Sequence, residues 1–241
     1  MGTTGIRALL ASAYDSDVAD RLPAGFTSGR TVLFAFVGLV IFLALPGLRL
    51  QRLFVASAVG ARIGREIVWA GIGALVLIWT VRIERLPLSS IGFRPPGRDT
   101  WLWGVATTLV LLASVIFTFA VIAPATGLSQ NMTATADLVR VPLWLLFLTP
   151  IVAGITEELI YRGYAIERLT LLTGRRWLAA VLAGSVFLLS HWAWGALQMI
   201  VVAIGTIILV GLYLWRRDLL CCIIAHVATD LVGLGLARLQ T

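Results

Sequence analysis

The chain has 241 residues, of which 59% are hydrophobic and only 13% are charged, about half the share that soluble globular proteins carry. Together with a mean hydropathy of +0.96, this composition excludes an ordinary soluble protein and indicates a polytopic membrane protein. The net charge of +7 rests on nineteen basic residues, all of them arginine. Because these arginines lie between apolar segments, we interpret them as orientation signals in a membrane and expect no nucleic-acid partner.

The first 140 residues are expected to form a polar tail followed by three membrane spans. Residues 1–30 are polar and mixed in charge, so they are interpreted as a solvated tail. The small-residue stretch 55–61 either lies at the membrane interface or extends the next helix. The region 31–140 is expected to contain spans at 31–48, 66–83 and 101–123, with loops at 84–100 and 124–140.

Residues 141–238 are expected to form a catalytic core of four helices. The first helix should cover about 141–172, and its later part, with Glu167 and Arg168, is expected to emerge into water. The uncharged stretch 177–215 follows. As one helix it would measure roughly 58 Å, nearly twice the ~30 Å hydrocarbon core of a bilayer.

That stretch is therefore expected to be a hairpin of two spans that turns near Trp194 and Gly195, and 219–236 forms the last span. The chain is thus predicted to be all-α, a transmembrane bundle of seven or eight spans. With seven spans and the N-terminus inside, thirteen arginines fall in inner segments and six in outer ones. The positive-inside rule favours this orientation, and we expect a multi-pass protein of a bacterial plasma membrane.

Two adjacent carboxylates, Glu157 and Glu158, follow a long apolar run. A carboxylate at the centre of a membrane helix costs about 2.5–3.5 kcal/mol on insertion scales, so such a pair indicates a functional site. Glu158 and Arg162 have the i,i+4 spacing of a helical ion pair. We therefore expect Glu158 to be neutralised and Glu157 to stay free, with Tyr161 as a hydrogen-bonding neighbour.

The chain has two histidines, His191 and His226, and both lie in expected spans. Glu157 lies 17 residues before the expected turn at Gly174 and His191 lies 17 after it, so the two should be level in a helical hairpin. By a similar count His226 has the same depth, and Asp230 shares its helix face. The sequence therefore predicts one site formed by three helices.

These residue types suit hydrolysis inside a membrane. A carboxylate beside a neutral imidazole can deprotonate water, while a second histidine with a neighbouring acid can donate to a developing oxyanion. This interpretation needs no cofactor. The alternative is a divalent metal such as zinc, held by Glu157, His191 and His226, which would activate its bound water.

Three motifs on separate spans resemble those of the CPBP family, which comprises the type II CAAX prenyl endopeptidases and the bacteriocin-processing enzymes. They are Glu157-Glu158-x-x-x-Arg162, Phe187-x-x-x-His191 and His226-x-x-x-Asp230. The resemblance covers about 141–238. It implies an intramembrane endopeptidase that acts on a peptide or protein substrate, lipidated or not, within the lipid bilayer.

The resemblance also implies roles for the motif residues. Glu157 would activate water beside His191, His226 and residue 230 would stabilise the oxyanion, and Glu158 with Arg162 would be structural. Asp230 departs from the family, which usually has Asn here. An Asp donates to an oxyanion only when protonated; otherwise it orients His226, or this member is tuned differently or inactive.

Two other functions compete with the peptidase. A proton-coupled transporter could use the same carboxylates and histidines as a relay. A non-catalytic scaffold or bacteriocin-immunity protein could keep the same fold. Packing hydrogen bonds between helices are the plain alternative for His226 and Asp230.

Overall fold

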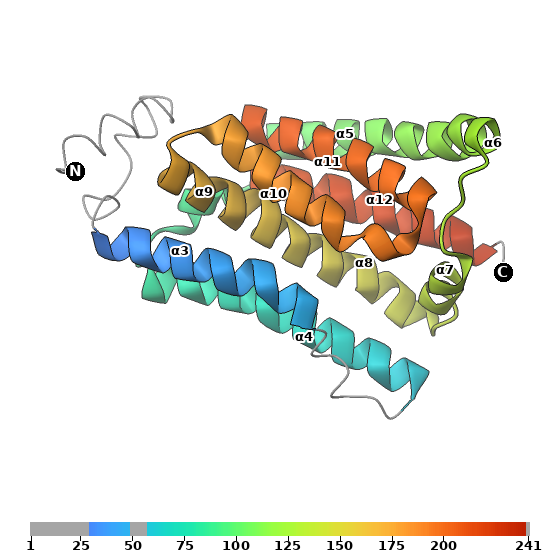
Figure 1. The fold of residues 1–241 in the computed structure, drawn as a ribbon, viewed down its shortest axis with the longest axis horizontal. Coiled ribbons are helices and arrows are strands. Elements are labelled where there is room, and N and C mark those ends of the chain that lie inside the picture. Colours follow the sequence, from blue (N-terminus) through green and yellow to red (C-terminus); the bar gives the residue numbers. More distant parts are fainter. Residues whose placement is uncertain (1–28, 49–56, 240–241) are drawn as a thin grey trace.

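The computed structural model describes residues 29–48 and 57–239, and every regular element in these ranges is a helix (Figure 1). The all-α prediction is confirmed. Most of the predicted tail lies outside the described residues, and Gly29 already begins the first helix. The N-terminal elements are α3 (Gly29–Ala44), η1 (Leu45–Leu48), α4 (Ala58–Ile78), η3 (Trp79–Ile83), η4 (Leu88–Ile91), α5 (Arg98–Phe117), η5 (Thr118–Ile122) and α6 (Ala123–Thr126).

The C-terminal part contains the helices that carry the motifs. The stretch after residue 141 forms one helical run, α8–η6–α9, whose middle section η6 is a π-helix. The elements are α7 (Met132–Val139), α8 (Leu143–Glu157), η6 (Glu158–Ala165), α9 (Ile166–Thr173), α10 (Arg176–Ser190), η7 (Trp192–Trp194), α11 (Ala196–Arg216) and α12 (Leu219–Leu239).

Six of the described helical runs are long and apolar enough to cross a membrane, which makes this an integral multi-pass membrane protein. The remaining predicted span, the fifth in chain order, is α10, which has 15 residues and is shorter than the others. The expected hairpin turn is present: η7 connects α10 to α11, and Gly195 there has φ +93°, a conformation that favours glycine. Of the ambiguous stretch 55–61, residues 58–61 belong to the next helix, because α4 begins at Ala58 with Ser57 as its N-cap. Residues 55 and 56 lie outside the described residues.

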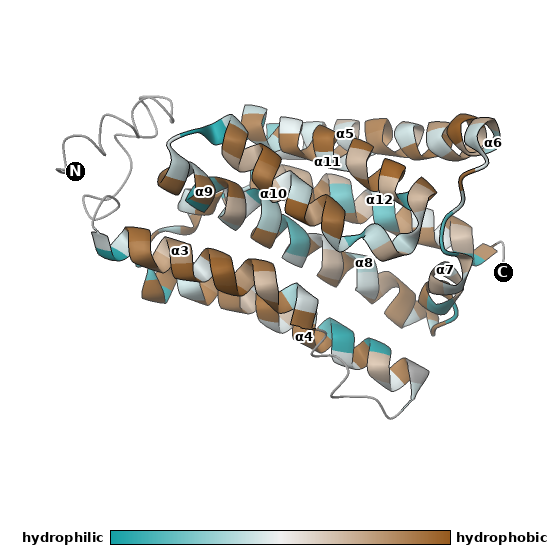
Figure 2. Ribbon diagram, in the orientation of Figure 1, coloured by the Kyte–Doolittle hydropathy of each residue, from teal (hydrophilic) through white to brown (hydrophobic). Residues whose placement is uncertain are grey.

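The run α8–η6–α9 is the central helix of the bundle. It packs against α3 and α4 on one side and against α10 and α12 on the other (Figure 1). In the most apolar 18-residue segment of this helical run 61% of the residues are buried, whereas in the corresponding segments of the other spans 22–28% are buried. The surrounding helices consist largely of apolar residues (Figure 2). Large apolar side chains on them, such as those of Leu109 and Leu189, are exposed, as expected for surfaces that face lipid.

One prediction about the central helix is wrong. Glu167 and Arg168 were expected in water, yet they are only 1% and 0% exposed. Arg168 forms a bidentate ion pair with Glu84, whose Oε2 lies 2.6 Å from Nη2, and Glu167 forms one with Arg217. The partners come from the segment after α4 and from the turn before α12, and these segments fold over α9.

Two tyrosines complete these ion pairs. Tyr164 donates to Glu84 at 2.7 Å, and Tyr213 donates to Glu167 at 2.9 Å. We call this set the α9 network; its members are Glu84, Tyr164, Glu167, Arg168, Tyr213 and Arg217.

Candidate active site

The two adjacent glutamates lie where the α-helix changes into a π-helix. Glu157 is the last residue of α8 and Glu158 is the first of η6. A π-helical stretch has wider turns than an α-helix and is frequent at functional sites. Both side chains point into the bundle and are buried, Glu158 completely.

Glu158 has two partners. Its Oε1 lies 3.0 Å from Nη1 of Arg162, so the ion pair expected from the sequence is present. The same oxygen lies 2.7 Å from Nδ1 of His226 on α12. Sequence reasoning had assigned Glu158 to the scaffold alone and missed this second contact, because i,i+4 spacing reports only on neighbours in the same helix.

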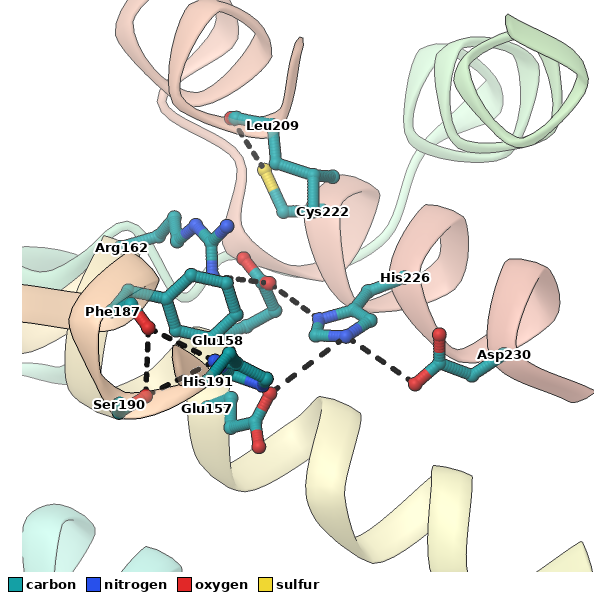
Figure 3. A network of polar contacts seen from close by, with 10 residues as sticks. All are labelled: Glu157, Glu158, Arg162, Phe187, Ser190, His191, Leu209, Cys222, His226 and Asp230. Atoms are coloured by element: carbon teal, nitrogen blue, oxygen red, sulfur yellow. Dashed lines mark hydrogen bonds and ion pairs between the residues drawn. The ribbon is translucent and has the colours of Figure 1, made fainter. Parts of the chain in front are cut away.

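His226 stands between three carboxylates (Figure 3). Its Nδ1 faces Glu158, while its Nε2 lies 3.8 Å from Oε2 of Glu157 and 3.5 Å from Oδ2 of Asp230. The latter two distances exceed those of ordinary hydrogen bonds. The side chain of Asp230 is 44% exposed, so it forms the open side of the group.

Of the buried carboxylates that the structure describes, Glu157 is the one that accepts no hydrogen bond. Among the described residues, the one side chain within ion-pair distance of its carboxylate is that of His226. The bond expected from Tyr161 is not formed; that ring packs edge-on against Phe187, with centroids 4.9 Å apart. The oxygens of Glu157 therefore remain available as hydrogen-bond acceptors.

His191 is linked to the site through Phe187. In the described part of the chain it makes no hydrogen bond to the residues of the other two motifs. It follows the last residue of α10, and its Nδ1 lies 2.9 Å from the carbonyl oxygen of Phe187 and 3.1 Å from Oγ of Ser190. The ring of Phe187 lies 4.6 Å from the His191 ring and 6.4 Å from the His226 ring. No hydrogen bond links His191 to Glu157 or His226 within the described part of the chain.

Phe187 also covers Arg162, whose guanidinium carbon lies 4.3 Å from the ring centroid. A cation over an aromatic face is attracted to it, more strongly when water is excluded. Phe187 therefore packs against Arg162, Tyr161 and His191, and its ring lies edge-on to that of His226. The sequence indicated this residue only as part of a motif.

A glycine on α8 sets the distance between the glutamates and His226. A Cβ atom added to Gly154 would lie 2.7 Å from Cγ2 of Val227, the residue after His226. Glycine at this position lets α12 approach α8 closely enough for the histidine to contact Glu158. Sequence reasoning did not single out Gly154, because small residues are common in membrane helices.

The predicted metal ligands do not form a metal site in this arrangement. Among the side chains that the structure describes, no group of three His, Cys, Asp or Glu residues is placed to hold a metal ion. Of the predicted set, Glu157 and His226 are neighbours, but His191 is held by Phe187. The cofactor-free interpretation and its metal-dependent alternative both stay predictions.

Residues 139–232 match the family model described as Type II CAAX prenyl endopeptidase Rce1-like. The matched region begins at the end of α7, ends within α12 and contains all three motifs. Searches of curated proteins and of solved structures gave no match. The predicted family resemblance is confirmed for this region: residues 139–232 match an Rce1-like type II CAAX prenyl endopeptidase domain, and at the level of the family this match supports a CAAX-protease-like intramembrane peptidase.

Proposed function

We propose that the protein is an endopeptidase in which Glu157 activates a water molecule for attack on a peptide bond. The observation that carries this proposal is the state of Glu157: a buried carboxylate that accepts no hydrogen bond among the described residues and lies 3.8 Å from His226. A general base must be within reach of its proton and not already occupied. Glu158, by contrast, is occupied by Arg162 and His226.

The reaction follows from this geometry. Glu157 takes a proton from water while the oxygen attacks the carbonyl carbon, and the carbonyl oxygen becomes an oxyanion. Nε2 of His226, when protonated, donates to that oxyanion, and Asp230 lies beside the same nitrogen. Glu157 then gives its proton to the leaving amine, and the carboxylate is regenerated.

His191 has a different place in this scheme. Because its Nδ1 is bonded to the carbonyl of Phe187, its Nε2 is the ring atom left for water or substrate. The neighbouring Phe187 ring keeps the interior side of the site apolar. An apolar surface that excludes water strengthens the electrostatic interactions with the reacting groups.

The substrate class follows from the family and the setting. A peptide or protein substrate in a membrane context agrees with the family match and with a site built between membrane helices. We propose that the scissile bond is presented at the membrane, and prenylated peptides are the first class to test. We also propose that the N-terminus lies inside the cell. Without Arg162 and Arg168, which are buried in the bundle, eleven arginines still fall in the inner segments and six in the outer ones.

The test uses purified protein in lipid nanodiscs with a panel of peptides, prenylated and unmodified. Replacement of Glu157 by the isosteric Gln should lower cleavage roughly 10²–10⁴-fold, the usual contribution of a general base. Glu66→Gln is the matched control, because Glu66 is another buried glutamate, on α4, bonded to Arg65 and Thr149.

Three outcomes would contradict the proposal. Cleavage that persists in Glu157→Gln would remove the assigned base. Proton-coupled uptake by vesicles that hold wild-type protein, without cleavage of any peptide, would support a transporter. Activity that a chelator abolishes and added zinc restores would replace the glutamate mechanism with a metal-dependent one.

A further inference from the structure

We infer that Glu158 is the positioning residue of the site: it holds the Nδ1 proton of His226 and so directs Nε2 toward Glu157 and Asp230. This inference rests on the proposed function for its kinetic test but not for its spectroscopic one. It gives Glu158 a part in the reaction beyond pairing with Arg162, and it does so through His226 and without contact to the substrate.

The geometry of His226 carries the first step. The 2.7 Å distance from Nδ1 to Oε1 of Glu158 is short for a nitrogen–oxygen hydrogen bond, as expected when one partner is charged. Glu158 is fully buried, so water does not compete for this oxygen. The opposite ring nitrogen, Nε2, then lies between Glu157 and Asp230.

Arg162 decides which partner carries the proton. Its guanidinium is 1% exposed, lies 3.0 Å from the same oxygen of Glu158 and stacks on Phe187. Within the described part of the chain none of its three nitrogens makes a geometrically good hydrogen bond. Its charge is therefore balanced mainly by Glu158, which favours the carboxylate form. A carboxylate only accepts hydrogen bonds, so the proton of this bond belongs to Nδ1.

His191 shows the same arrangement with a different acceptor. Its Nδ1 lies 2.9 Å from a backbone carbonyl, which also only accepts. Both histidines of the chain are thus fixed through Nδ1 and leave Nε2 for chemistry. Because Nδ1 of His226 keeps its proton, Nε2 donates to an oxyanion only when the ring is an imidazolium with a proton on both nitrogens. His191 serves as an internal reference, because its bond does not involve Glu158.

The two histidines allow a direct spectroscopic test. Protein labelled with ¹⁵N-histidine contains two imidazole rings, and His191→Gln assigns their signals. In the wild type, Nδ1 of His226 should carry a proton throughout the pH range in which the protein stays folded. The signal should be that of a strongly hydrogen-bonded N–H.

The informative variant replaces the ion pair as a unit. Glu158→Leu combined with Arg162→Met removes both charges, so no uncompensated buried charge destabilises the fold. We expect the variant to fold, and the Nδ1–H signal of His226 to be lost while that of His191 is kept. The matched control, Glu84→Leu with Arg168→Met, removes the other buried ion pair and should leave both histidine signals unchanged.

Kinetics separate a positioning role from a structural one. In the Glu158 and Arg162 double variant kcat should fall roughly 10²–10⁴-fold, as when a catalytic histidine loses the carboxylate that orients its ring and stabilises its imidazolium form, whereas KM should be unchanged. An unprotonated Nδ1 in the wild type, an Nδ1–H signal of His226 that persists in the variant, or a lost signal with unchanged kcat would each overturn the inference. If the wild type cleaves nothing, the proposed function fails, and the spectra still test the bond to Glu158.

Discussion

The central helix carries two buried ionic groups of opposite character, about ten residues apart. In the α9 network, Arg168 and Glu84 form a bidentate pair, and Tyr164 adds a third hydrogen bond. In the active site, Glu157 accepts no hydrogen bond among the described residues, and a second oxygen of Glu158 has no partner there.

The difference shows which charges serve the fold and which serve chemistry. Buried charges stabilise a structure only when their hydrogen-bonding capacity is used, as it is in the α9 network. A general base must keep an unused lone pair, and that raises the energy of the folded protein. On this comparison, damage to the α9 network should reduce stability, whereas damage to the site should reduce turnover.

The largest effect on stability is expected from Arg168→Met. The change leaves the buried carboxylate of Glu84 without its cation, which typically costs about 3–5 kcal/mol. Thermal or denaturant unfolding in detergent should show this loss, and the fraction that stays folded should cleave peptide at the wild-type rate per molecule. A catalytic rate that falls in parallel with stability would contradict the division between the two groups.

A smaller effect, on turnover, is expected from Gly154→Ala. The added methyl group would displace Val227 and with it His226, and a displacement of about 1 Å in a catalytic group can cost about 100-fold in rate. The measurement is kcat/KM on a substrate that the wild type cleaves. Gly233→Ala on α12 is the control, since a Cβ there meets nothing within 4 Å; equal losses in both variants would show that the α8–α12 contact is not the cause.

The smallest effect is expected from Asp230→Asn. Asn has the same shape and can donate to an oxyanion without first binding a proton. Because the contact with His226 is long, at 3.5 Å, and the side chain is half-exposed, we expect kcat to stay within about tenfold of the wild type, or roughly 1.4 kcal/mol. A loss far beyond tenfold would assign the carboxylate itself, and not merely its shape, to the site.

Much of the site could be predicted because its signals are local. Long apolar runs predicted the positions of the helices. Because these runs contain few charged residues, Glu157, Glu158 and the two histidines were conspicuous in them. Counting residues from Gly174 placed Glu157 level with His191, and a separate count from Arg217 placed His226 at the same depth. The contact between Glu158 and His226 was not predictable, because it depends on the π-helical turn and on the close approach at Gly154.

The α9 network was mispredicted for a related reason. An acid next to a base, as in Glu167 and Arg168, is typical of a helix end in water. Their partners, Glu84 and Arg217, lie far away in the sequence, so only the folded chain shows that four charges neutralise one another.

The short helix α10 has a consequence for the surrounding lipid. Its 15 residues cover roughly 22 Å, less than the ~30 Å thickness of a hydrocarbon core. Beside α10 the bilayer must become thinner, or headgroups and water must enter, to match this length. We therefore expect activity to fall when the protein is reconstituted in lipids of longer acyl chains. The water needed for the reaction would then reach the site through the thinned part of the membrane beside α10, next to His191.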